Sequence, residues 1–159
     1  MKYAIALLLG LSLTSCRSDE DLRTMIREEI AKASAKTFYP SKNVIGPYSP
    51  AVQVGKMLFV SGQIGLNPET SEFVDNDIES QTRQALVNLM SVMRRAGYDS
   101  SDVVQCSVFL KDMKEFQRMN LIYGGFFADG QYPTRATVEV ANLPRNAKVE
   151  IAAIAFKSK

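Results

Sequence analysis

The chain has 159 residues, with 19 Lys and Arg against 17 Asp and Glu and no histidine. This length supports one domain with a substantial core and is too short for two ordinary domains. The absence of histidine excludes Ser-His-Asp and Cys-His nucleophiles, histidine-ligated metals and two-histidine ribonuclease mechanisms. Balanced charge without a basic cluster argues against a nucleic-acid partner.

Residues 1–15 have the layout of a lipoprotein-type signal peptide. Lys2 gives a short basic start, and residues 4–13 form an apolar run too short to span a bilayer as a permanent helix. Residues 13–15 then lead into Cys16, which resembles the bacterial lipobox. We expect lipidation of Cys16 and an envelope location on the periplasmic or outer-membrane side. An ordinary signal peptide or a misassigned start codon are the alternatives, and an unused leader implies a cytoplasmic chain.

Residues 16–41 are expected to connect the lipid to a folded domain over residues 42–159. Residues 17–36 are charged and carry apolar side chains at helical spacing, which predicts a short amphipathic tether. No heptad repeat persists long enough for a coiled-coil stalk. The interpretation is therefore a solvated linker.

The domain is predicted to begin with two strands, residues 51–54 and 57–64, which meet at a turn of Gly55 and Lys56. A loop over residues 65–76 follows. Residues 77–96 are the clearest helix, because their apolar residues recur with the helical period and Gly97 supplies a stop.

Residues 103–110 alternate in polarity and predict the third strand, in which Cys106 is expected to be a small buried hydrophobe. Residues 113–127 predict a second helix. Residues 134–140 and 148–156 predict two further strands, joined by a tight turn that contains a proline.

Alternation in these last two strands places Arg135 and Glu150 away from the most apolar parity. A guanidinium in apolar surroundings is costly unless an anion meets it. The anion is either Glu150, in a structural ion pair across adjacent strands, or a ligand. The residues alone leave both possibilities open.

The predicted order ββαβαββ indicates an α+β domain, with two helices on one face of a sheet. The opposite parity is also apolar, and we assign Arg135, Glu150 and Ser61 to it. A sheet face that its own chain leaves uncovered is normally covered by another subunit. The sequence therefore predicts an oligomer. The apolar residues of this second parity are Met57, Phe59, Phe109, Ile154 and Phe156.

Several segments, in the same order along residues 42–159, closely resemble the RidA/YjgF family. They are residues 45–50 (IGPYSP), 60–64 (VSGQI), 109–113 (FLKDM), Asn120 with Tyr123, residues 126–127, 132–140 (YPTRATVEV) and 149–155 (VEIAAIA).

This resemblance implies a chorismate-mutase-like fold with a mixed sheet, assembled as a homotrimer with pockets between subunits. It also implies hydrolytic deamination of reactive enamine and imine intermediates to 2-oxo acids and ammonia. The substrates implied are 2-aminoacrylate, 2-iminopropanoate and 2-iminobutanoate. No metal or organic cofactor is required.

The resemblance also assigns roles to individual residues. Arg135 matches the arginine that binds the substrate carboxylate, and Glu150 matches the carboxylate that orients or activates water. Pocket residues of the family match Tyr48, Ser61, Gly62 and Asn120. A cysteine common in the family is Thr137 here, which puts thiol-based functions in doubt.

Two other functions compete with deamination. The leader motivates a non-catalytic, small-acid-binding or chaperone-like envelope lipoprotein of the same fold, because most enzymes that make 2-aminoacrylate are cytosolic. An endoribonuclease activity, attached to the family's name, is disfavoured by the missing histidine and the missing basic surface.

Overall fold

A computed structural model of the chain describes residues 18–41, 46–128 and 130–158, in two units that divide after Ser34. The predicted leader and Cys16 lie outside the described residues. The first unit contains α1 (Asp19–Ser34), where a linker was expected. Ser18 Oγ accepts a hydrogen bond from the Asp21 amide at 3.1 Å, and the Asp21 carboxylate accepts one from the Ser18 amide, which together form a helix-initiating capping box. No described helix has the length and apolar character needed to cross a bilayer.

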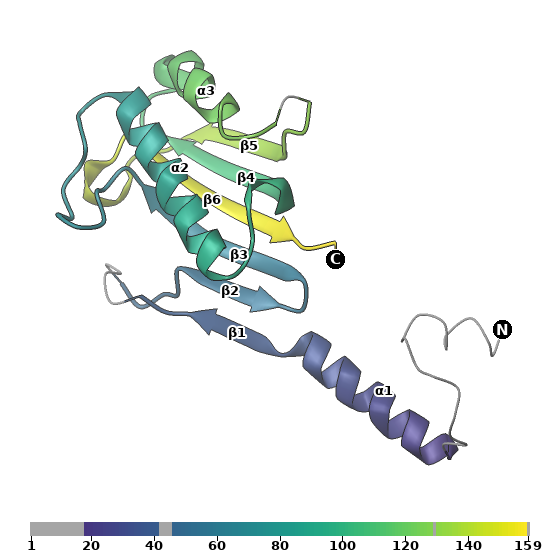
Figure 1. Ribbon diagram of the computed structural model, residues 1–159. Helices are drawn as coiled ribbons and strands as arrows, with labels where there is room; N and C mark the ends of the chain where they lie inside the picture. The colour runs from purple at the N-terminus through teal and green to yellow at the C-terminus, as the bar shows by residue number, and fades with distance from the viewer. Residues whose placement is uncertain (1–17, 42–45, 129, 159) are drawn as a thin grey trace. The chain divides into compact units, whose positions relative to one another are not determined.

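The second unit is an α+β domain built on one mixed sheet, with the strand order β1-β2-β3-β6-β4-β5 (Figure 1). Antiparallel pairing joins all neighbours except β4 and β5, which are parallel. The strands are β1 (Lys36–Tyr39), β2 (Ala51–Val54), β3 (Met57–Ile64), β4 (Val103–Leu110), β5 (Thr134–Glu139) and β6 (Val149–Phe156).

Strand β1 was not predicted, and it places the start of the sheet before the expected boundary near Lys42. It has four residues and pairs with β2 as an edge strand, from Lys36 opposite Val54 to Tyr39 opposite Ala51. Its residues are mostly exposed, so its sequence lacks the buried parity that identified the other strands.

The longer helices are α2 (Ile78–Arg95) and α3 (Phe116–Gly124). Asp77 caps α2 by accepting the Ser80 amide at 2.7 Å, and this hydrogen bond lowers the pKa of Asp77. Gly97, at φ 82°, ends the helix as predicted. The predicted helix over 113–127 is a 3₁₀ turn at Met113–Glu115 followed by α3.

The last two strands do not form the predicted hairpin. Strand β4, helix α3 and strand β5 form a parallel crossover that carries β5 to the sheet edge. The chain then turns through the 3₁₀ segment Pro144–Asn146, and β6 enters between β3 and β4. Alternation and turn residues identified the strands correctly, but these local signals do not determine which strands pair.

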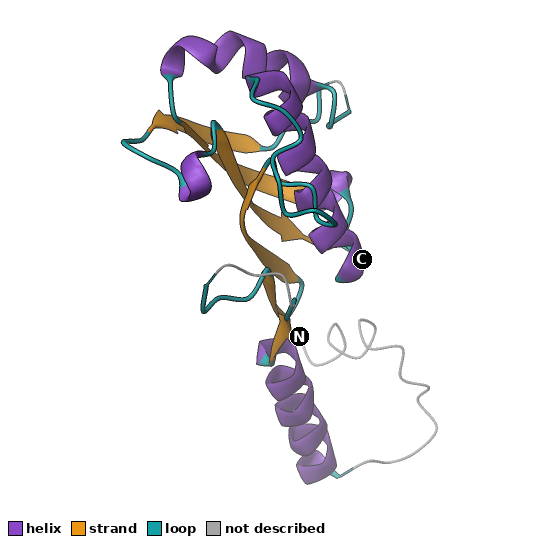
Figure 2. Cartoon of the chain, turned by 90° about the vertical axis from the view of Figure 1, so that its left-hand side faces the viewer, coloured by secondary structure: helices purple, strands orange, loops and turns teal. Residues whose placement is uncertain are grey.

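Both α2 and α3 lie on one face of the sheet, as predicted (Figure 2). The core between them is formed by Leu58, Val108 and Ile151 of the sheet, Leu86, Leu89 and Met93 of α2, and Met119 and Tyr123 of α3. The opposite face, here called the open face, leaves Met57, Phe59 and Phe156 exposed at 37%, 42% and 44%. No described segment of the second unit covers these side chains fully.

Candidate functional site

Four of the predicted site residues lie around one cavity of about 270 Å³, here called the glutamate half-site. A register shift between Val60 and Gln63 takes Ser61 and Gly62 out of the regular β3–β6 ladder. The Ser61 amide donates to Pro50 O at 2.9 Å, and its hydroxyl donates to Ser49 O at 2.7 Å. These bonds tie the strand to the segment that carries Tyr48. The lining residues are Tyr48, Ser61, Gly62, Ile64, Pro144 and Glu150.

Glu150 lines this cavity, and no cationic side chain of residues 18–41, 46–128 or 130–158 forms an ion pair with it. Burial raises the pKa of its carboxyl group above the ordinary value, because the charged form loses solvation. The Glu150 carboxylate forms no hydrogen bond or ion pair with the described residues. Gly62 makes this position possible, since a Cβ atom at Gly62 would overlap Glu150 Oε1 and lie 2.6 Å from Cδ.

The other two predicted residues, Asn120 and Arg135, line a separate cavity of about 320 Å³, here called the arginine half-site. Arg135 Cζ lies 4.6 Å from the ring centroid of Tyr123 and 5.6 Å from that of Phe116. Within the described part of the chain, Arg135 forms no ion pair. Six residues line this cavity: Asn120, Tyr123, Gly124, Tyr132, Pro133 and Arg135.

Two polar atoms near Arg135 are buried without a partner among the described residues. They are Asn120 Oδ1 and Thr137 Oγ1. Burial, together with the neighbouring Cys106 thiol, raises the pKa of Tyr123. Cys106 is fully buried as predicted, and its burial raises the pKa of its thiol. Unpartnered buried groups are uncommon, and they leave this half-site with unused hydrogen-bonding capacity.

The two half-sites lie on opposite faces of the sheet, so the assignment of Arg135 to the face of Glu150 and Ser61 is wrong. Arg135 is in register with buried Cys106, on the helix-covered face. Glu150 is in register with Phe109, which in turn pairs with exposed Val138 on the open face. The apolar parity of β5 was taken as the inner one, but in this edge strand it faces outward.

This arrangement excludes a structural Arg135–Glu150 ion pair within one chain. Strand β4 lies between β5 and β6, and the two side chains extend from opposite faces. Each charged group is therefore available to a ligand or to another molecule.

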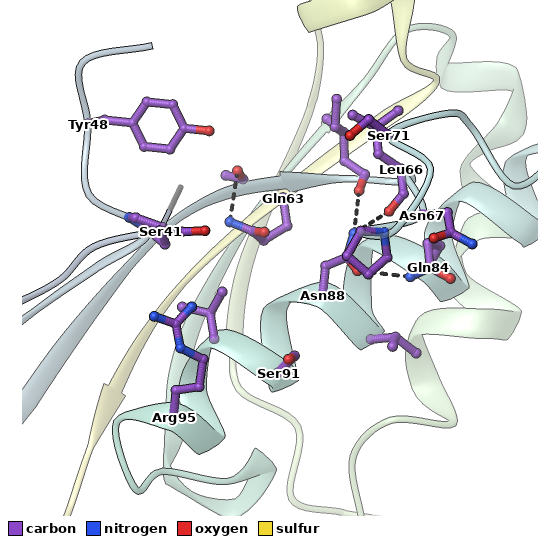
Figure 3. A pocket seen from close by; sticks show the side chains of 16 residues that line it. Ser41, Tyr48, Gln63, Leu66, Asn67, Ser71, Gln84, Asn88, Ser91 and Arg95 are labelled. Carbon is purple, nitrogen blue, oxygen red and sulfur yellow. Dashed lines mark hydrogen bonds between the residues drawn. The ribbon is translucent and has the colours of Figure 1, made fainter. Parts of the chain in front are cut away.

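A third cavity, of about 280 Å³, adjoins the glutamate half-site and shares Tyr48, Gly62 and Ile64 with it (Figure 3). Asn88 of α2 donates to Ile64 O at 3.0 Å and to Leu66 O at 2.8 Å, where β3 ends. Gln84 donates to Asn88 Oδ1 at 2.8 Å and fixes the amide. These polar residues are occupied in holding the end of β3 on α2, so we assign them a supporting role.

Sequence reasoning missed seven lining or contact residues: Ile64, Phe116, Tyr123, Gly124, Tyr132, Pro133 and Pro144. Phe116 and Tyr123 had been assigned to the apolar face of a helix, which they also serve. Their spacing with Asn120 places all three on one side of α3, and a polar residue in that stripe was the available signal. Neither half-site suggests a metal: the described residues contain no group of three or more Cys, Asp or Glu side chains placed to bind one.

Comparison with known proteins gives a consistent result. A family model described as "Endoribonuclease L-PSP" matches residues 40–157. Protein DfrA of Myxococcus xanthus is 47% identical over 136 residues, which cover 84% of this chain and 98% of the relative. A Mus musculus protein named 2-iminobutanoate/2-iminopropanoate deaminase is 43% identical over 128 residues, covering 80% and 93%.

Among solved structures, the YjgF gene product of E. coli superposes with a TM-score of 0.71 at 39% identity, covering 76% of this chain and 98% of that one. The family model spans every strand of the sheet except β1. The chain belongs to the RidA/YjgF family, whose family model is described as endoribonuclease L-PSP.

Proposed function

We propose that this chain hydrolyses reactive enamine and imine forms of small 2-amino acids to 2-oxo acids and ammonia. The substrates are 2-aminoacrylate with its imine, 2-iminopropanoate, and 2-iminobutanoate. The observation that carries the proposal is the division of the family-matched residues into two open half-sites. Among the described residues, the arginine of one half-site has no carboxylate partner and the glutamate of the other has no cationic partner. The name of the mouse relative supports the same substrate class.

The catalytic site is formed when the arginine half-site of one copy meets the glutamate half-site of the next. The open face supports this assembly, because exposed Met57, Phe59 and Phe156 gain burial when a second copy covers them. A homotrimer is the assembly that the family resemblance implies. It gives each copy two neighbours, one for each half-site.

Arg135 binds the substrate carboxylate through two parallel N–H donors. Because imine carbon C2 is already electrophilic, one water molecule with a proton acceptor is enough for addition. Glu150 accepts a proton from the water as its oxygen bonds to C2, and passes this proton to the nitrogen as the C=N bond becomes a single bond. In the second step Glu150 takes the hydroxyl proton of the carbinolamine and delivers it to the nitrogen. The C–N bond then breaks while the C=O bond forms, which releases ammonia and leaves the 2-oxo acid. An enamine substrate first takes a proton at C3 and loses one from nitrogen, which gives the imine.

The raised pKa of Glu150 suits this role. A carboxyl group shifted towards neutrality is a stronger base once ionised, and returns the proton readily in the second step. The neighbouring copy's arginine half-site brings a cation that opposes the shift. Asn120, Tyr48, Ser61 and the backbone at Gly62 complete the pocket wall.

The test uses an amino-acid oxidase that generates the imine in situ, with ammonia release or loss of imine absorbance as the readout. Purified protein is expected to accelerate hydrolysis, and Arg135→Ala to abolish most of the acceleration. Wild-type protein that gives no acceleration over buffer, and is indistinguishable from Arg135→Ala, overturns the proposal. RNA incubated with the same preparation should remain intact after full purification.

A lipid-anchored location in the cell envelope is part of the proposal, and the residue order up to Cys16 supports it. The same leader favours a second candidate, an envelope lipoprotein that binds small 2-oxo acids without turnover. Radiolabelled palmitate should be incorporated into the wild-type chain and not into Cys16→Ser. Calorimetric binding of 2-oxobutanoate without imine hydrolysis would favour the second candidate.

A further inference from the structure

Arg135 is held in an unusual way for an exposed arginine. It lies on β5 at the edge of the sheet, its side chain is exposed, and it has no carboxylate partner in the described part of the chain. A free arginine side chain has many rotamers and loses that freedom when it binds a ligand. Something else must fix this guanidinium if it is to bind a carboxylate tightly.

Two aromatic rings of α3 lie within cation–π distance of the guanidinium. The centroid distances are 4.6 Å for Tyr123 and 5.6 Å for Phe116, both within the range of about 6 Å for this interaction. Tyr123 is itself buried, at 4% exposure, and its ring centroid lies 5.0 Å from that of Phe127. The rings therefore form a fixed surface, here called the aromatic shelf (Phe116 and Tyr123).

We propose that the aromatic shelf positions Arg135 for the substrate carboxylate without occupying its N–H groups; the proposal rests on the function given above. Ring faces attract the guanidinium through its charge and flat face, whereas its N–H donors point outward in its own plane. A carboxylate partner would also fix the side chain, but it would take the same donors and cancel the charge. The aromatic shelf holds the guanidinium and leaves its N–H donors free to bind a carboxylate.

The shelf acts on binding rather than on the chemical step. The substrate carboxylate contacts Arg135 equally in the ground state and in the transition state, so a loosened guanidinium weakens both complexes alike. Loss of the shelf is therefore expected to raise KM while kcat at saturating substrate stays near the wild-type value. A general packing defect has no reason to produce this separation.

The test compares Tyr123→Leu and Phe116→Leu with the matched control Tyr123→Phe in the full chain. Affinity for 2-oxobutanoate is measured by calorimetry, KM and kcat are measured with the imine assay, and thermal unfolding is recorded for each variant. Both leucine variants are expected to bind 2-oxobutanoate about 3- to 30-fold more weakly. Tyr123→Phe, which keeps the ring, is expected to bind within about twofold of wild type.

Wild-type affinity in a folded leucine variant overturns the shelf, as does a fall in kcat without a change in KM. If Tyr123→Leu does not fold, Phe116→Leu decides, because Phe116 is only half-buried. A failure of the proposed function gives a different result: wild-type protein does not accelerate imine hydrolysis, and Arg135→Ala binds 2-oxobutanoate as wild type does.

Discussion

The two half-sites treat their charged groups in opposite ways. Arg135 stays exposed at the sheet edge and is held by aromatic ring faces, with no ionic partner in the described chain. Glu150 is half-buried on a central strand, packs against the backbone of Gly62, and has a raised pKa. The cation keeps its full charge, and the carboxyl group has lost part of its tendency to ionise.

This difference matches two chemical tasks. Binding a carboxylate requires a permanent charge with free donors, whereas moving a proton requires a group whose pKa lies nearer the working pH. Within one chain the two groups lie on opposite faces with β4 between them, so the guanidinium does not oppose the effect of burial on the pKa of Glu150. The separation also leaves the N–H donors of Arg135 free for a substrate carboxylate.

The largest effect is expected when either half-site is removed. Arg135→Ala should lose about 100-fold or more of kcat/KM, because the substrate carboxylate loses its charged partner. Glu150→Gln should lose about 100-fold or more of kcat, because the proton acceptor is gone. Co-expressed and purified as mixed oligomers, the two inactive variants should regain activity, because one interface then combines an intact arginine half-site with an intact glutamate half-site. Imine hydrolysis by the mixed oligomer, against each variant alone, is the measurement.

Mixing the separately purified variants without subunit exchange is the control, and it should remain inactive. Mass spectrometry should first establish that the sample contains mixed oligomers. If the activity of that sample does not exceed the sum of the two single variants, the site is not shared between copies.

A smaller effect is expected from one methyl group in the glutamate half-site. Gly62→Ala places a Cβ atom on the Glu150 carboxylate, so either the carboxylate or strand β3 must move. A displacement of about 1 Å in a catalytic group costs up to about 100-fold in rate. The expected loss in kcat is therefore about 10- to 100-fold, with affinity for 2-oxobutanoate less affected because Arg135 is untouched.

Gly125→Ala is the matched control. Gly125 follows α3 at φ −70°, and an added Cβ there would meet only Ile122 O, at 3.6 Å. This variant should keep its activity and its unfolding temperature. Equal kcat in Gly62→Ala and wild type would show that the position of Glu150 is not critical.

Much of the domain could be predicted because its signals are local. The helical period and the glycine stop located α2, and alternation located five of the six strands. The number of predicted helices and strands also indicated that both helices cover one face of the sheet and that a second apolar face stays uncovered. Strand β1 escaped because its four residues are mostly exposed and carry no periodic burial.

The position of Arg135 could not be predicted because it depends on pairing between distant segments. Alternation correctly placed Arg135 and Thr137 on the same side of the strand. It did not determine which face of the sheet that side belongs to. In the edge strand β5 the apolar parity points outward, as Val138 does at 46% exposure. The aromatic shelf was hidden for a related reason, since Phe116 and Tyr123 also satisfy the ordinary pattern of a helix packed on a sheet.

The smallest expected effect concerns the stability of the glutamate half-site. Burial raises the pKa of Glu150 in the folded chain above its ordinary value of 4.5, which unfolding restores. The folded state therefore favours the protonated carboxyl group. The contribution of Glu150 to the free energy of unfolding is fully present below pH 4.5. This contribution is lost as the pH rises through the raised pKa that Glu150 has in the folded chain. Glu150→Gln carries no charge at any pH and escapes this loss.

The unfolding temperature of Glu150→Gln, minus that of wild type, should consequently increase from below pH 4.5 towards pH 7, by on the order of 1 °C. Differential scanning calorimetry across this pH range measures the difference. Glu139→Gln is a suitable comparison for charge removal at an exposed position, although its Oε2 accepts the Met113 amide at 2.7 Å. If the difference in unfolding temperature instead shrinks with rising pH, the prediction of a destabilising Glu150 charge is contradicted. Glu150 then has a cationic partner in solution, and the arginine half-site of a neighbouring copy is the candidate.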